Sequence, residues 1–372
     1  MSKRVGLITF HASHNCGSMM QTYALQTSVE RRGVSCEVID FSNEGQRRLY
    51  GIKQPNNSLK NIVKNLILFP HLERIKRNHA SYEQFKNDNF HLSPKEYSKG
   101  AQMEDSRYDI VITGSDQVWN VTIEDADDAY YLPWVKHARK VAYAPSFGAK
   151  SLQKYADDLE RYKKYLNEFD MLSIREKNGQ KWLAELLNRE VPVLLDPTLL
   201  LCAEDYDKIA MQNLKLPEKY IFYYSPGYSK DINTLIKKVS EKYDLPVIAF
   251  NTKTFYVKGV QRLGFTLPEV ENPAAYLTLI KNASVIFTTS FHGTVFSSIY
   301  KKAFWTIKNG GMFGDDDRVK TLIAQLGLED RLVPIEFDDT CDYLQAPDYT
   351  VYENNLAELQ NQSNAYLDDA LL

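Results

Sequence analysis

Short apolar runs alternate with amphipathic stretches along most of the chain, and this alternation predicts an α/β fold. Residues 5–10 form one compact apolar run, and residues 36–41 form another. Between them, apolar residues recur at near-helical spacing up to Arg32 and Gly33, which are typical of a helix end. A strand, a helix and a second strand at this spacing form a βαβ unit, so we expect a parallel sheet.

The same rhythm continues in two series. The first predicts strands at 109–113, 140–144, 170–174 and 191–195, with helices at 152–167 and 176–187. The second predicts strands at 220–224, 246–250, 284–288 and 304–307, with helices at 230–242, 273–282, from about 292 to before 304, at 316–326 and at 353–371. We therefore expect two Rossmann-like domains that face a cleft, each with a parallel sheet flanked by helices. The expected domains are residues 1–205 and 218–340, with residues 341–372 crossing back to the first.

A helical insertion at residues 45–107 interrupts the first series. Within it, residues 59–87 have a helical pattern that breaks at Pro70. Basic and apolar side chains alternate there: Lys60, Lys64, Arg74, Lys76 and Arg77 flank Ile62, Val63, Leu66, Ile67, Leu68 and Phe69. A basic helix with an apolar face can lie on an anionic membrane, which predicts peripheral membrane contact through residues 59–77. The alternative is that the apolar face packs on the domain and the charges are solvated.

Composition narrows the class of protein. The 372 residues include 45 Lys and Arg against 48 Asp and Glu, a net charge of −3 that predicts no nucleic-acid partner. The apolar fraction of 44% excludes a disordered chain. The four cysteines are far apart without a CxxC pair, so we expect neither a disulfide framework nor a structural metal. No apolar run approaches the ~20 residues of a membrane span, and we expect a cytoplasmic protein.

Polar side chains that could bind a ligand or take part in a reaction follow several predicted strands. Open parallel sheets bind ligands at these strand ends. Residues 14–18 contain Gly17 before a helix start, which suits an anion or a hydroxyl but equally an ordinary turn. Residues 114–120 combine hydroxyl, amide, carboxylate and indole groups, a mixture suited to a sugar. Asp116 in this loop can accept a proton from a hydroxyl nucleophile. The alternative is a capped helix start with Trp119 in the core.

Two further loops offer cationic groups. Arg175 follows the strand at 170–174 and can grip a carboxylate or a phosphate, or instead pair with an acid such as Glu176. Residues 288–294 end a strand in hydroxyls, His292 and a glycine, directly before a helix. A helix start favours a phosphate, and His292 can donate a proton near neutral pH.

Taken together and in order, these segments resemble the polysaccharide pyruvyl transferase family. The resemblance rests on Asn15-Cys16-Gly17, Tyr108-Asp109 through Gly114-Ser115-Asp116-Gln117-Val118-Trp119-Asn120, Ser146-Phe147-Gly148, Arg175-Glu176, Leu195-Asp196-Pro197-Thr198, Ser290-Phe291-His292-Gly293-Thr294 and Leu326–Leu332. It implies a GT-B-like fold and transfer of a pyruvyl group from phosphoenolpyruvate to a sugar of a surface or capsular polysaccharide precursor. The product is a cyclic ketal and phosphate is released. The resemblance implies no cofactor beyond phosphoenolpyruvate as co-substrate, and no metal in the reaction.

Residue roles follow from the resemblance and from this chemistry. We expect His292 to act as the acid beside the phosphate and Asp116 as the base beside the sugar. The remaining donor residues are expected to be Arg175, Ser290, Gly293, Thr294 and Arg318. The remaining acceptor residues are expected to be Asn15, Gly17, Ser115, Gln117, Trp119, Asn120 and Ser146. The acceptor is expected to be a lipid-linked oligosaccharide, which places the protein at the inner face of the membrane.

One departure from the family pattern bears on the donor site. Some members of the family carry an arginine at the position of Ser290, and Arg318, Lys301 and Lys302 are candidate replacements. Two alternatives stay open at this point. One is a glycosyltransferase of the same architecture that uses a nucleotide sugar. The other is a non-catalytic glycan-binding relative, for which Ser290 is the main support.

Overall fold

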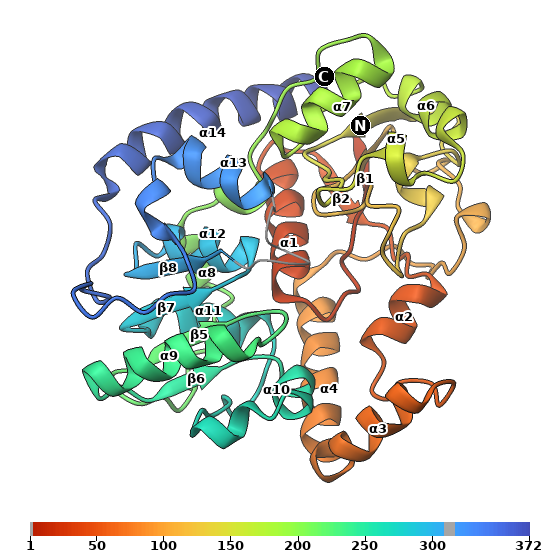
Figure 1. Ribbon diagram of the computed structural model, residues 1–372. Coiled ribbons are helices and arrows are strands. Elements are labelled where there is room, and N and C mark those ends of the chain that lie inside the picture. Colours follow the sequence, from red (N-terminus) through yellow and green to blue (C-terminus); the bar gives the residue numbers. More distant parts are fainter. Residues whose placement is uncertain (1–2, 309–316) are drawn as a thin grey trace.

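The strands form two parallel sheets, each flanked by helices (Figure 1). The computed structural model describes residues 3–308 and 317–372. Within these ranges one sheet has the strand order β2-β1-β3-β4 and the other has the order β6-β5-β7-β8-β9. Every pairing within the two sheets is parallel. The predicted fold class, with two parallel sheets flanked by helices, is therefore confirmed.

The N-terminal sheet unit carries the insertion between its second and third strands. Its elements are β1 (Arg4–Ile8), α1 (Cys16–Glu30), β2 (Ser35–Val38), α2 (Glu44–Tyr50), α3 (Leu59–Leu68), α4 (Leu72–Asn89), β3 (Ile110–Thr113), β4 (Arg139–Ala142), α5 (Leu152–Tyr155), α6 (Leu159–Asn167), α7 (Lys177–Leu187) and α8 (Ala203–Asp207). Pro70 lies in a short 3-10 turn between α3 and α4, where the sequence predicts a break.

The C-terminal sheet unit begins with β5 and ends in the long helix α14. Its elements are β5 (Ile221–Tyr224), α9 (Lys230–Tyr243), β6 (Val247–Ala249), α10 (Thr252–Val257), α11 (Pro273–Asn282), β7 (Val285–Thr288), α12 (Phe291–Ile299), β8 (Phe304–Ile307), α13 (Asp317–Leu326), β9 (Leu332–Val333) and α14 (Tyr349–Leu371). The four strands predicted for this half are all present.

Two local predictions are wrong in detail. Residues 170–174 and 191–195 do not extend the sheet as strands: they make only isolated parallel bridges, such as Val141 with Met171. The helix predicted at 152–167 is broken into α5 and α6. Asp158 causes the break because its side chain accepts a hydrogen bond from the Arg161 backbone N–H and so begins a new helix.

One of the hydrophobic clusters formed by the described residues contains side chains of both sheet units. Met19 and Met20 of α1 belong to the same buried cluster as Tyr276 of α11 and Phe291 of α12. Figure 1 shows α1 between the two units. Burial of this shared apolar surface fixes the first turn of α1 against the C-terminal unit.

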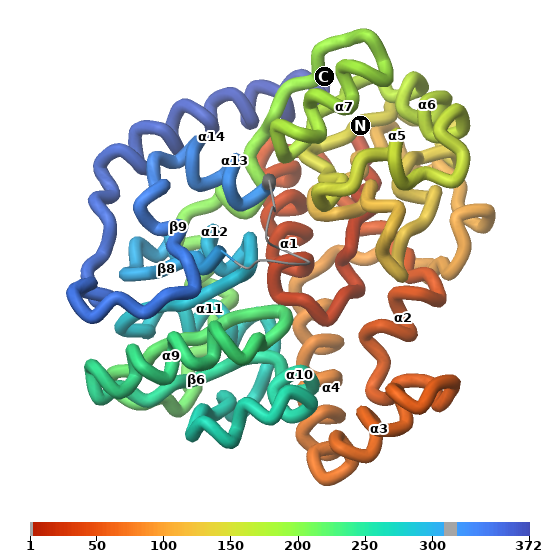
Figure 2. Tube along the Cα trace, in the orientation of Figure 1, coloured from red at the N-terminus to blue at the C-terminus, as the bar shows by residue number. Residues whose placement is uncertain are grey.

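Helix α14 also connects the units. Near its start, Tyr349 donates a hydrogen bond to the Lys302 carbonyl oxygen of the C-terminal unit. Near its end, Tyr366 donates to the Ala142 carbonyl oxygen of β4, and Ser363 accepts from the Leu195 N–H. The helix therefore runs from one sheet unit to the other, as the chain trace in Figure 2 shows.

The insertion supports the C-terminal unit from the other side. Asn78 of α4 donates hydrogen bonds to Thr252 and Glu271, and Figure 2 shows α4 beside α10. Arg74 and Arg77 donate to the carbonyl oxygens of residues 268 and 269. The predicted membrane-facing role of these two arginines is wrong, because their guanidinium groups bind the C-terminal unit. None of the described helices is long and apolar enough to span a membrane.

Candidate functional site

The ends of the parallel strands β3 and β7 and the start of α1 bring polar side chains together between the sheet units. Asp116 follows β3, and its Oδ2 accepts a hydrogen bond of 2.5 Å from Ser18 in the first turn of α1. His292 follows β7 in the first turn of α12. Asp116 has a φ of 67°, a left-handed conformation that Asp tolerates better than most residues. These positions agree with the expectation that chemistry lies beyond the carboxyl ends of the strands.

Arg175, Asp196 and His292 form the charged centre of the site. The Nη1 group of Arg175 donates a hydrogen bond to Oδ2 of Asp196, and the same oxygen lies 3.4 Å from Nε2 of His292. The Nη2 atom of Arg175 lies 3.6 Å from Oδ1 of Asp116. The guanidinium also stacks 4.5 Å from the centre of the Phe291 ring. Arg175 therefore links two carboxylates of the N-terminal unit to the first turn of α12.

Several buried donors at this centre have no hydrogen-bond acceptor. They are Nε and Nη2 of Arg175 and Nε2 of His292. Arg175 is 3% exposed and His292 is 7% exposed, so water does not readily satisfy these groups. Unpaired buried polar atoms are uncommon and costly in folded proteins. Nη2 of Arg175 and Nε2 of His292 make only ion-pair contacts, at 3.6 Å from Asp116 and 3.4 Å from Asp196, so these buried donors keep hydrogen-bonding capacity for an anionic ligand.

The cations keep both carboxylates ionised despite burial. Burial alone would raise the pKa of Asp116, but the charges of Arg175 and His292 together with the Ser18 hydrogen bond hold it below its usual value. Burial opposes ionisation of Asp196 too, and His292 and Arg175 again lower its pKa well below the usual range. Both groups are therefore anions at neutral pH.

Glu176 behaves in the opposite way. Its Oε1 accepts hydrogen bonds from the Phe147 N–H at 2.8 Å and from Ser146 at 3.1 Å, while the buried Oε2 has no partner. Burial raises the pKa of Glu176 to about 7, even though Arg175 and Arg318 act in the other direction. A carboxyl group that titrates near neutral pH can exchange a proton with the site.

Gly17 lies directly against the His292 side chain. A Cβ atom built on Gly17 would lie 2.1 Å from Nδ1 of His292, far inside van der Waals contact. A glycine is therefore required here by close approach between α1 and α12. Gly17 is predicted to bind the acceptor, whereas in the structure it contacts His292, which is predicted to lie on the donor side.

Arg318 is the surviving candidate to replace the arginine absent at Ser290. It is buried in α13, and its positive charge lowers the pKa of both Asp116 and Glu176. The other two candidates are wrong. Lys301 forms an ion pair with Glu353 on α14, and Lys302 donates a hydrogen bond to the carbonyl oxygen of Lys281.

The other expected donor residues lie in the first turn of α12 with internal contacts. Ser290 caps the helix and accepts a hydrogen bond from the Gly293 N–H. The Thr294 hydroxyl lies 2.7 Å from the Thr306 hydroxyl in β8 and is buried. Gly293 packs against Thr288. The Thr294 hydroxyl thus connects helix α12 to strand β8, and its role in holding the donor stays a prediction.

Trp119 is also wrong as a sugar-stacking surface. Its side chain is fully buried, stacked on Tyr131 at 5.4 Å between ring centres and tilted against Phe147. Its indole N–H donates to the Tyr130 carbonyl oxygen. No face of the ring is left for a sugar because the apolar area around the indole is better buried in the core.

The remaining acceptor candidates divide by exposure. Ser115, Asn120 and Ser146 are buried with internal partners: Ser115 donates to the Ala144 carbonyl oxygen, and Asn120 donates to Gln117. Gln117 is half-buried. Asn15 is exposed and caps α1 by accepting from the Gly17 N–H at 2.9 Å. Asn15 and Gln117 are thus the acceptor candidates with solvent-accessible surface.

Three residues of the site, Asp196, Glu176 and Ser18, were not among the predicted donor, acceptor or catalytic residues. Asp196 and Glu176 lie inside recognised segments, and Ser18 adjoins one, but nothing in the spacing pairs them with other groups. The available signal was position alone, since Asp196 directly follows an apolar run and precedes a proline. Only the fold shows that Asp196 joins Arg175 to His292.

Comparison with known proteins gives one family. The polysaccharide pyruvyl transferase family matches residues 15–311. No curated protein sequence matches the chain.

Solved structures that resemble the chain share little sequence with it. The UDP-GlcNAc 2-epimerase from Neisseria meningitidis bound to UDP-GlcNAc is 13% identical with a TM-score of 0.49, over 99% of this chain and 94% of that chain. MurG from Acinetobacter baumannii is 9% identical with a TM-score of 0.42, over 99% and 94%. The E. coli heptosyltransferase WaaC is 12% identical with a TM-score of 0.39, over 83% and 89%. Likeness at this level carries no inference about substrate or mechanism.

Proposed function

The chain belongs to the polysaccharide pyruvyl transferase family, and on that premise we propose that the Arg175–Asp196–His292 centre binds phosphoenolpyruvate and directs its pyruvyl group to a sugar. The enzyme is a transferase that moves pyruvyl groups to polysaccharide sugars. The product at this site is a cyclic ketal on a sugar of a surface or capsular polysaccharide precursor. The observation that carries the proposal is the set of buried donors without acceptors on Arg175 and His292.

The donor's chemistry fits these groups. Phosphoenolpyruvate carries a carboxylate and a phosphate, which together present several acceptor oxygens to fixed cations. The planar guanidinium of Arg175 can donate two parallel hydrogen bonds to one of these anions through Nε and Nη2. His292, at the start of α12, is within reach of the other. Arg318 adds positive potential from α13, which supports the same assignment.

The reaction needs one acid and one base. His292 donates a proton to C3 of the enol, which makes C2 electrophilic, and a sugar hydroxyl then forms a C–O bond to C2. The proton of that hydroxyl passes to Asp116. The C2–O bond to phosphate then breaks with its electron pair, and a second hydroxyl closes the ketal ring. The phosphate takes up the second hydroxyl proton. Proton exchange with solvent then removes the first hydroxyl proton from Asp116 and reprotonates His292, so that in total one proton stays on C3 and one leaves with phosphate.

Asp196 and Ser18 position the two groups that move protons. The Asp196 carboxylate lies 3.4 Å from Nε2 of His292 and so orients the ring that donates the proton. Ser18 donates to Oδ2 of Asp116, which fixes the carboxylate beside Arg175. Asp116 is a weak base, so it accepts the hydroxyl proton only as the C–O bond forms and the hydroxyl becomes acidic.

Phosphate release from phosphoenolpyruvate tests the function. The purified chain is incubated with phosphoenolpyruvate and lipid-linked galactose or mannose acceptors, and the acceptor is weighed by mass spectrometry. We expect stoichiometric phosphate and a ketal on the acceptor, both lost in His292→Ala but not in His91→Ala, a surface histidine paired with Glu30. Normal turnover by His292→Ala would defeat the assignment of the acid.

The finer proposal is that the acceptor is lipid-linked and that α3 contacts the cytoplasmic face of the membrane. Large apolar side chains on α3 and just after it are exposed: Leu59 82%, Ile62 38%, Val63 53%, Leu66 68%, Ile67 39% and Phe69 69%. At 3.6 residues per turn they fall within an arc of roughly 160°. Lys60 and Lys64 lie at one edge of that arc, where they can reach anionic headgroups.

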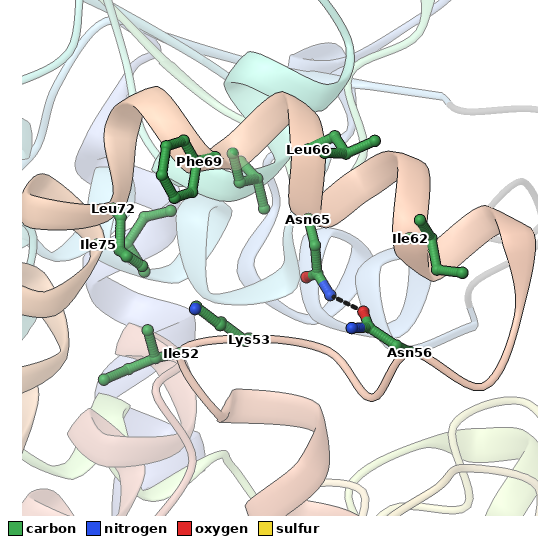
Figure 3. Close-up of a pocket in the computed structure, with 10 residues that line it drawn as sticks. Ile52, Lys53, Asn56, Ile62, Asn65, Leu66, Phe69, Leu72 and Ile75 are labelled. Atoms are coloured by element: carbon green, nitrogen blue, oxygen red, sulfur yellow. Dashed lines mark hydrogen bonds between the residues drawn. The ribbon is translucent and has the colours of Figure 1, made fainter.

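The opposite face of α3 packs on the protein. Leu68 is buried, and Asn65 donates hydrogen bonds to the Gln54 carbonyl oxygen and to Asn56. A pocket opens beside this helix, as Figure 3 shows, with Lys53 between apolar side chains such as Ile52 and Leu72. The pocket continues the exposed apolar surface of α3 inward, because Ile62, Leu66 and Phe69 line it too. An acyl or isoprenoid chain suits such a lining.

Vesicle sedimentation tests the membrane contact. We expect Val63→Asp to abolish binding to vesicles that contain anionic phospholipid, and Val351→Asp to leave it intact. The two valines are matched, at 53% and 52% exposed. Unchanged sedimentation of Val63→Asp would refute the contact without affecting the assignment of the donor site.

A further inference from the structure

His14, His79 and Glu83 form a cluster outside the charged centre. His14 lies in the loop between β1 and α1, and the other two lie one turn apart on α4. Nε2 of His14 lies 2.7 Å from Oε1 of Glu83, and the rings of His14 and His79 are 4.4 Å apart. One nitrogen from each histidine and one oxygen of Glu83 lie within 4.8 Å of one another.

We propose that His14, His79 and Glu83 bind a divalent transition-metal ion, with zinc as the natural probe. Two imidazoles and one carboxylate are a ligand set typical of such ions. The expectation that the protein has no structural metal was based on the spacing of its cysteines. It does not apply to this cluster, because none of the three residues is a cysteine. The ion takes no part in the pyruvyl transfer described above.

The distances suit a small ion after a modest adjustment. With bonds of about 2.0–2.2 Å, tetrahedral ligand atoms lie roughly 3.3 Å apart. The pair at 2.7 Å must open, and the pairs at up to 4.8 Å must close. All three residues are half-buried, so one coordination position remains open to water. This openness excludes the fully closed arrangement of a structural zinc finger.

Neighbouring side chains already hold the first and third ligands. The His14 ring is stacked on Tyr82, at 5.0 Å between ring centres and 9° between planes. Lys86 lies 2.8 Å from Oε2 of Glu83, which leaves Oε1 directed at His14. Groups that orient ligands in this way raise the affinity of metal sites. The positive charge of Lys86, however, repels a metal cation. Removing this charge should therefore strengthen metal binding, which can be tested.

The ion would connect the loop before α1, which contains His14, to helix α4, which is hydrogen-bonded to the C-terminal unit. His14 precedes Gly17, which touches His292, by three positions. Helix α4 is hydrogen-bonded to the C-terminal unit through Asn78. A metal bridge between His14 and α4 would therefore fix the loop before α1 to the helix that is hydrogen-bonded to the C-terminal unit.

The test uses the full chain, stripped with a chelator, with any affinity tag removed and exposed Cys202 alkylated. Zinc binding is measured by competition with a chromophoric chelator, and the thermal midpoint is followed in parallel. We expect one ion per chain and a midpoint that rises with zinc concentration. His79→Ala and the near-isosteric Glu83→Gln are expected to weaken binding at least about tenfold.

Two matched variants distinguish the cluster from unspecific binding. His91→Ala removes a surface histidine that pairs with Glu30 at 2.6 Å, and it should leave zinc affinity unchanged. Lys86→Met removes the repelling charge and should strengthen binding. The proposal is overturned if wild type binds no zinc, or if His79→Ala and Glu83→Gln bind it as tightly as wild type while circular dichroism shows them folded.

Discussion

Gly17→Ala is the most informative substitution in the site, because local and tertiary effects have opposite signs. Gly17 lies in the first turn of α1, where alanine alone would favour the helix by up to about 1 kcal/mol. The new Cβ, however, would lie 2.1 Å from Nδ1, 2.4 Å from Cγ and 2.8 Å from Cβ of His292. Ordinary contact begins at 3.4 Å, so the ring or the helix must move by 3.4 − 2.1 = 1.3 Å.

That displacement falls on His292, the proposed acid. His292 is 7% exposed and faces Asp196, so its ring has little room to rotate away. A misplacement of about 1 Å in a reacting group costs roughly 100-fold in rate. We therefore expect Gly17→Ala to lower kcat/KM for phosphoenolpyruvate about 100-fold, measured by phosphate release. Gly227→Ala is the matched control, because its Cβ would meet nothing within 4 Å.

A double-mutant cycle supplies the refutation. In the His292→Ala background the ring is gone, so Gly17→Ala should change from destabilising to neutral or stabilising in thermal unfolding. If Gly17→Ala has wild-type kcat/KM, or if its effect on the thermal midpoint is the same with and without the His292 ring, the two residues are not in contact in the working enzyme.

Three further substitutions test the electrostatics of the site. Burial raises the pKa of Glu176 from 4.5 to about 7, so the folded state loses on the order of 3 kcal/mol of stability as the pH rises through that window. Glu176→Gln should remove this loss. If the variant shows the same difference in thermal midpoint between pH 5 and pH 8 as wild type, the prediction is wrong. Asp116→Asn should lower kcat about 10²- to 10⁴-fold without raising KM for phosphoenolpyruvate, because it removes a base and an anion beside Arg175. A raised KM with a normal kcat would show that Asp116 binds the donor and is not the base. Arg318→Ala should raise that KM about tenfold while Arg318→Lys does not, and equal KM values would exclude Arg318 from the donor site.

Much of the fold follows from short-range pattern. The period of apolar residues and the polar strand ends predict both parallel sheets, because buried strands and amphipathic helices leave distinct repeats. The pattern fails where a local group overrides it, as at Asp158, whose cap splits a predicted helix. It also fails at residues 170–174, where only isolated bridges form because the segment pairs too briefly to extend the sheet.

The site was harder to predict because its contacts are long-range. The positions of Asp116, Arg175 and His292 follow from strand ends, but their pairing through Asp196 depends on the fold. Trp119 was predicted to be available to a sugar but is buried, because the sequence of a polar loop does not indicate whether an indole within it is exposed. The same limit applies to the basic insertion, where Arg74 binds backbone of the C-terminal unit.

A crystal structure of the chain with phosphoenolpyruvate tests the central claim most directly, because the donor is not consumed when no acceptor is present. The account predicts that one anionic group of the donor accepts hydrogen bonds from Nε and Nη2 of Arg175 and that the other contacts His292. Phosphoenolpyruvate bound elsewhere, with Nε and Nη2 of Arg175 still lacking acceptors, would contradict it.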